Sequence, residues 1–109
     1  MTFNFAADSP LSAAGQNGAE FVSPALDASG HDEIAVICHA DQPGAYQVEW
    51  GHSFSGVVYW DGASDEVVLA AEAREALVLP VYGRWVRFRF RNAGEAQTTF
   101  RCSGRLHRR

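Results

Sequence analysis

The sequence contains no lysine, although it holds nine arginines. It also has no apolar run near the ~18–20 residues that a membrane-spanning segment needs. The first residues, MTFNFAADSP, lack the basic start and long apolar run of a signal peptide. We therefore expect no membrane association. The chain should be made in a cytoplasm and stay soluble, unless it leaves the cell as part of a larger particle.

Residues for catalysis and metal binding are scarce and scattered. The only cysteines, Cys38 and Cys102, allow at most one disulfide, and buried free thiols are the favoured expectation because each lies among apolar residues. No G-x-S-x-G motif is present, and no glycine loop precedes a helix. The histidines lack the close spacing of a metal site; they are His31, His39, His52 and His107. The sequence predicts no enzyme, no catalytic residue, no metal site and no cofactor.

Charge is divided unevenly along the chain. Residues 1–83 hold twelve of the thirteen acidic residues and one arginine, Arg74, whereas residues 84–109 hold eight arginines and Glu95. Most of these arginines alternate with large apolar residues, which indicates a folded segment and not a basic tail. Arginine forms bidentate bonds to carboxylates and stacks on aromatic rings, so this composition favours a protein interface. It suits subunits that meet each other, or an acidic sheet paired with a basic one.

Short apolar segments separated by turn residues predict the fold. About eight such strands predict an all-β chain that forms a single antiparallel β-sandwich, of the jelly-roll or immunoglobulin-like kind. Segment 69–79 favours a helix locally, but its β-branched flanks indicate a loop between two strands. We expect a sandwich domain at residues 18–109 and an N-terminal arm at residues 1–17. The strand candidates are 34–38, 45–50, 56–60, 66–71, 76–82, 84–91 and 98–104, with weaker ones at 3–5 and 19–26.

Alternation within the strands predicts which side chains are buried. In 84–91, Val86, Phe88 and Phe90 fall on one side, and Trp85 falls on the other with Arg87, Arg89 and Arg91. We expect 98–104 to return as the antiparallel partner of this strand. The predicted core comprises Ile34, Val36, Val48, Trp50, Val86, Phe88, Phe90 and Phe100.

The polar side of these two strands is the candidate interaction site. If 98–104 pairs with 84–91, five or six guanidinium groups share one sheet face. This face could bind nucleic acid, bind an acidic protein or sugar, or be a solvated face with cross-strand Arg–Glu pairs. Net acidity and the lack of a recognition motif argue against nucleic acid. The candidate interface residues are Arg84, Trp85, Arg87, Arg89, Arg91, Arg101 and Arg105.

Aromatic residues offer a second candidate site. An exposed indole or phenol ring can stack on a sugar, and arginine beside it can bind sugar hydroxyls or carboxylates. Tyr59, Trp60 and Trp85 form the candidate glycan platform. The alternative for Trp85 is simple packing over a sheet edge.

Four segments together resemble a small β-sandwich module of tailed-bacteriophage virion proteins. The most specific are PVYGRWVRFRFRN (80–92) and AQTTFR (96–101); LDASGHDEIAV (26–36) and the turn at 41–44 also fit. The resemblance covers roughly residues 18–106. HSFSG (52–56) departs from it, since a Ser-x-Asp-Gly turn is expected there.

The resemblance implies a structural role in a virion and no catalytic residues. Because the chain starts at Met and ends without a linker, it suits a stand-alone capsid decoration protein that binds the head exterior in many copies and stabilises it. The alternative is a tail, baseplate or head-fibre module that binds host carbohydrate. Implied partners are the major capsid protein or other virion proteins and a homo-oligomer, with a trimer favoured; glycan binding would be weak. Localisation would be the virion, assembled in the host bacterial cytoplasm, and the arm at 1–17 would order on assembly and contribute to docking.

Overall fold

The computed structural model describes residues 2–6, 11–96 and 99–108, which form strands and no helix. None of this described part could cross a membrane as a helix. The strands are β1 (Thr2–Ala6), β2 (Glu20–Val22), β3 (Leu26–Asp27), β4 (Glu33–Ala40), β5 (Gly44–Phe54), β6 (Val57–Ala63), β7 (Val67–Leu69), β8 (Arg74–Pro80), β9 (Trp85–Asn92) and β10 (Phe100–His107).

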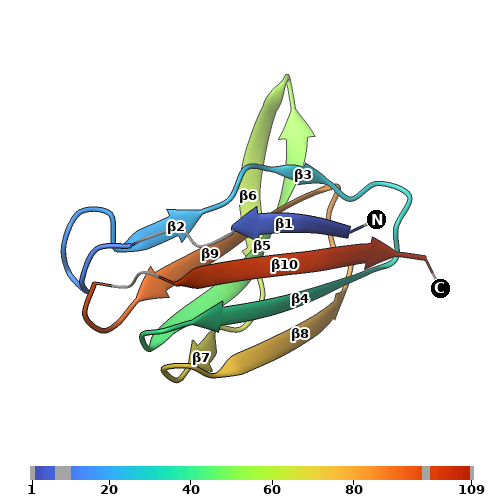
Figure 1. The fold of residues 1–109 in the computed structure, drawn as a ribbon. Helices are drawn as coiled ribbons and strands as arrows, with labels where there is room; N and C mark the ends of the chain where they lie inside the picture. Colours follow the sequence, from blue (N-terminus) through green and yellow to red (C-terminus); the bar gives the residue numbers. More distant parts are fainter. Residues whose placement is uncertain (1, 7–10, 97–98, 109) are drawn as a thin grey trace.

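The strands form two antiparallel sheets that pack face to face (Figure 1). A four-stranded sheet has the order β1-β10-β4-β8. A six-stranded sheet has the order β2-β9-β5-β6, with β3 also paired to β9 and β7 to β5. The all-β sandwich predicted from the sequence is confirmed. Segment 69–79, which favours a helix locally, is divided between β7, a turn at residues 71–72 and β8.

The core lies between the sheets and is built by residues that alternate along each strand. In β4 and β9 every second residue is buried. All eight predicted core residues are buried, and none is more than 5% exposed. Aromatic rings fill the centre: Phe100 of β10 lies 4.4 Å from Phe90 and 6.2 Å from Phe88 of β9, measured between ring centroids.

The expected pairing of 98–104 with 84–91 is wrong. β10 pairs with β1 and β4, whereas β9 pairs with β2, β3 and β5 in the other sheet. Phe100 therefore contacts Phe88 and Phe90 across the core from the opposite sheet, and does not lie beside them in the same sheet. Because both strands turn their apolar sides inward, their arginines point out of opposite faces of the sandwich, and the single face with five or six guanidinium groups does not exist.

Part of the expected N-terminal arm belongs to the sandwich. Residues 2–6 form β1, which runs antiparallel along β10. Leu11 lies in the core. The Ala14 N–H donates to the carbonyl of Gly94 at 2.9 Å. Ordering of the arm on assembly stays a prediction. Removing residues 1–17 would also remove β1, which pairs with β10.

The β5–β6 hairpin extends beyond the rest of the sandwich (Figure 1). β5 has eleven residues, and its last ones pair with β6 alone. The two turn residues, Ser55 and Gly56, have φ angles of 53° and 79°. Positive φ at both positions is the type I′ geometry, which suits the twist of a tight hairpin.

Candidate protein-interaction site

The arginine stripe, which we define as Arg87, Arg89 and Arg91, lies on the outer face of the six-stranded sheet. β9 turns Val86, Phe88 and Phe90 into the core, so the residues between them must face outward. β9 is an inner strand, with β2 on one side and β5 on the other. The stripe is therefore flanked by side chains from both neighbours.

A half-buried carboxylate holds two members of the stripe. Glu49 of β5 is directly opposite Arg87, and its side chain is only 13% exposed. The Arg87 Nε donates to Glu49 Oε1 at 2.8 Å. The Arg89 Nε lies 3.2 Å from the same oxygen as an ion pair. One carboxylate thus balances parts of two guanidinium groups at a site partly shielded from water.

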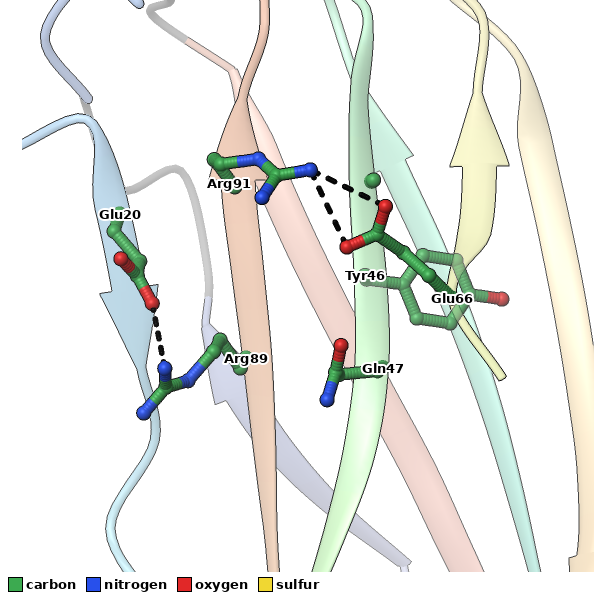
Figure 2. A pocket seen from close by; sticks show the side chains of 7 residues that line it. Glu20, Tyr46, Gln47, Glu66, Arg89 and Arg91 are labelled. Carbon is green, nitrogen blue, oxygen red and sulfur yellow. Dashed lines mark hydrogen bonds and ion pairs between the residues drawn. The ribbon is translucent and has the colours of Figure 1, made fainter. Parts of the chain in front are cut away.

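Two further glutamates complete the neutralisation of the stripe (Figure 2). Arg89 Nη1 lies 3.1 Å from Glu20 of β2. Arg91 Nη2 donates to both carboxylate oxygens of Glu66, at 3.2 and 3.3 Å. Three arginines face three glutamates from three different segments. The solvated face with cross-strand Arg–Glu pairs, one of the alternatives from the sequence, is the arrangement that the structure shows.

The aromatic candidates do not form one platform. Trp60 lies on the same face as the stripe, with the Arg87 guanidinium carbon 4.3 Å from its ring centroid. Trp85 donates its indole N–H to Ser53 Oγ at 2.8 Å. Tyr59 points to the opposite side of the hairpin, where its ring lies 6.4 Å from that of His52. Adjacent strand residues face opposite sides, so Tyr59 and Trp60 cannot share a platform.

Gly51, which the sequence did not single out, lets Trp60 lie against β5. A Cβ atom at Gly51 would be 2.9 Å from Trp60 Cε3 and 2.8 Å from Val58 Cγ1. These separations are too short for real side chains, so only glycine leaves room for the indole ring over the strand. Gly51 directly follows the predicted strand 45–50, so its place inside β5 was not apparent from the sequence.

Arg84 is paired as well, near β3. Its Nη2 lies 3.2 Å from Asp27 Oδ2. The Ser29 N–H donates to the other oxygen of the same carboxylate at 2.9 Å. The pKa of Asp27 is lowered to about 2. The largest cause is the hydrogen bond from the Ser29 backbone N–H, and hydrogen bonds from the Ser29 side chain and then Arg84 add to it.

The remaining predicted interface residues lie on the far side of the molecule. Arg101 and Arg105 are exposed on the outer face of the four-stranded sheet, because β10 turns Phe100 and Cys102 inward. Arg101 is directly opposite His39, which is opposite Arg74 of β8. The predicted set is therefore divided between two outer faces.

The cysteines of the described part are buried, and three of its histidines contact carboxylates. Cys38 and Cys102 face each other across β4 and β10 as free, buried thiols. Burial raises the pKa of the Cys102 thiol, which disfavours the reactive thiolate. Within these residues no group of three or more His, Cys, Asp or Glu side chains could hold a metal ion. Three histidines each have one carboxylate partner: His39 with Glu72, His52 with Asp61 and His107 with Glu33.

Comparison with known proteins shows the fold and no family. No protein-family model and no curated protein matches the chain. The crystal structure of PBSX exported protein XepA is similar, with a TM-score of 0.76 and 18% sequence identity. The match covers all of this chain and 37% of that chain. At this identity the likeness establishes a shared β-sandwich architecture.

Proposed function

We propose that this protein is a structural component of a bacteriophage particle. The observation that supports it most directly is the fold match of the whole chain to part of XepA, a phage-derived exported protein. The resemblance of residues 80–92 and 96–101 to virion sandwich modules points the same way. Both concern the sandwich as a building unit of phage proteins.

The arrangement of charge on the six-stranded sheet fits a structural role. The arginine stripe is neutralised by Glu20, Glu49 and Glu66 on the same face. Charge-assisted pairs that link β2, β9, β5 and the segment before β7 hold neighbouring strands in register. A stripe that is already neutralised has little charge left for phosphate, so nucleic acid stays outside the proposal.

Within the particle, we assign the chain to the head as a capsid decoration protein. It would bind the major capsid protein on the exterior in many copies and strengthen the contacts between capsid subunits. A compact sandwich with two broad sheet faces can cover a surface while contributing no chemistry of its own. The function is therefore mechanical: the bound protein raises the free energy needed to separate capsid subunits.

The glycan-binding alternative has less support. The Arg87 guanidinium group lies over one face of the Trp60 ring. The indole N–H of Trp85 is engaged by Ser53, and Tyr59 faces the other side of the hairpin. These rings cannot present one continuous stacking surface to a sugar.

Purified particles provide the test. Quantitative mass spectrometry should detect this protein at a copy number comparable with that of the major capsid protein. Particles produced without the gene should release DNA at a lower temperature, and adding the purified protein should restore their stability. Absence of the protein from particles purified from producing cells would overturn the proposal. A copy number near that of tail components would overturn the assignment to the head.

A further inference from the structure

The outer face of the four-stranded sheet carries an apolar strip beside arginine side chains. We name this the cationic face; its apolar strip crosses β4 and β8. Ile37 is 48% exposed and Val78 58% exposed, although both are large apolar side chains on strands. Ala35 lies opposite both Val78 and Arg105. The face consists of Ala35, Ile37, Ala76 and Val78 with Arg74, Arg101 and Arg105 around them. The ion pairs His107–Glu33 and His39–Glu72 lie at its edges.

The charges on the cationic face differ from those of the arginine stripe. Among the described residues, neither Arg74 nor Arg105 forms an ion pair with a carboxylate. The stripe on the other sheet has a glutamate for every arginine. The chain has a formal net charge of −4, so acidic groups outnumber basic ones. Even so, in the described part of the chain Arg74 and Arg105 have no carboxylate partner. The face is suited to an acidic surface with an apolar centre.

The protruding β5–β6 hairpin carries a surface of the opposite kind. On β5, His52 and Phe54 continue the same side as the buried Trp50, but they extend beyond the facing sheet. Phe54 is opposite Val57, and His52 is opposite Tyr59. We name this the hairpin face; it consists of His52, Phe54, Val57, Tyr59 and Asp61.

This hairpin face is apolar, exposed and acidic at its base. Phe54 is 68% exposed, Val57 51% and Tyr59 47%. Asp61 lies 3.4 Å from His52, and its side chain is 67% exposed. Asp65 follows β6 and is also exposed. A cluster of large exposed apolar side chains beside acidic groups marks an interaction surface.

We propose that the hairpin face of one copy of this chain packs against the cationic face of a second copy. Phe54 and Val57 would cover Ile37 and Val78, and Asp61 would approach the arginines of that face. Two cationic faces cannot pair with each other without like-charge repulsion. Because the two surfaces differ, the contact is head-to-tail, and repetition gives a closed ring or a filament. The inference concerns self-association and holds whether or not the chain belongs to a phage particle.

Charge-introducing variants at exposed positions test the contact with little risk to folding. Phe54→Glu places a charge in the hairpin face and leaves the cationic face intact. Ile37→Glu places a charge in the cationic face and leaves the hairpin face intact. Val68→Glu is the matched control, since Val68 is 78% exposed and belongs to neither surface. Sedimentation velocity over a wide concentration range measures the assembly state, and far-UV circular dichroism checks the fold.

The wild-type chain and the Val68→Glu variant should form the same assembly, larger than a dimer. Phe54→Glu and Ile37→Glu should each be monomeric, with self-association at least tenfold weaker. Their mixture should form a 1:1 heterodimer, because one intact hairpin face then meets one intact cationic face. A monomeric wild-type chain, or a mixture of folded variants that remains monomeric, would overturn the proposal.

A covalent test covers the case in which Ile37→Glu fails to fold. Phe54→Cys and Val78→Cys are made separately, mixed and oxidised; the native cysteines are buried. Mass spectrometry of peptides should find an intermolecular disulfide between positions 54 and 78. Cross-links that join only like positions, 54 with 54 or 78 with 78, would refute a head-to-tail contact.

Discussion

Replacing Glu49 by Gln tests whether the arginine stripe is held by internal ion pairs. Glu49 is the carboxylate with the least exposed side chain in the network, at 13%, and it contacts both Arg87 and Arg89. The Glu49→Gln variant keeps the shape of the side chain but removes its charge. Two partly buried guanidinium groups then lie close together, with only Glu20 beside Arg89.

The expected cost lies between the limits for exposed and buried pairs. Loss of one partner costs about 3–5 kcal/mol in a buried pair, and an exposed pair contributes only about 0–1 kcal/mol. The Arg87 side chain is 21% exposed, so we expect a loss of about 2 kcal/mol in the free energy of unfolding. For a domain of this size the melting temperature should fall by roughly 8 °C.

Glu66→Gln is the matched control, because it also removes a glutamate that contacts the stripe. Its pair with Arg91 is more exposed, with side chains 42% and 61% accessible. We expect a loss below about 0.5 kcal/mol. Chemical denaturation at low salt measures both variants, and repetition at 1 M salt should leave most of the Glu49 effect intact. Equal costs for the two variants would refute the view that burial of Glu49 makes the stripe a structural feature.

Three further predictions concern the core, a buried hydrogen bond and acid stability. Phe100→Ala should lower the free energy of unfolding by about 3–5 kcal/mol, since its fully buried ring joins the two sheets; a guanidinium titration showing a cost under about 1 kcal/mol contradicts this. Ser23→Ala should cost about 1–3 kcal/mol, because the Phe88 N–H donates to Ser23 Oγ at 2.8 Å; a Ser23→Thr variant that retains the hydroxyl should recover part of the loss in the same titration. The pKa of Asp27 is lowered to about 2, mainly by the Ser29 backbone N–H, so its ionised form adds stability that is present above pH 4 and lost as the pH falls towards 2. Asp27→Asn should therefore flatten thermal stability across that window, and an unchanged acid limb would refute the assignment.

The phase of each strand was predictable from the sequence. Alternation in RWVRFRF places Phe88 and Phe90 inward and the stripe outward, whatever the strand order. The same reasoning places Glu49 on the face opposite to Trp50. Local side-chain periodicity fixes these features because one face of each sheet must be buried.

The strand order was not predictable in the same way. Alternation along 98–104 is satisfied equally in either sheet, because both sheets turn an apolar face towards the same core. The sequence therefore identified Phe100 as a core residue but placed Arg101 on the wrong face. The pairing of Glu20 and Glu66 with the stripe was likewise not predictable, because it depends on which distant segments flank β9.

Within the candidate glycan platform, the structure separates Tyr59 from Trp60. Tyr59 and Trp60 were grouped because both are aromatic and adjacent in sequence. In a strand, adjacency places two side chains on opposite faces. The period-2 rule, applied to this pair, separates the two rings on the sequence alone.

The position of the protein on purified particles tests whether it is a capsid decoration protein. Cryo-electron microscopy of particles from producing cells, compared with particles made without the gene, gives a difference map. We expect repeated density of sandwich size over the outer surface of the head, lost in the deletion and restored by added protein. Identical head surfaces in the two maps, or extra density confined to the tail, would contradict it.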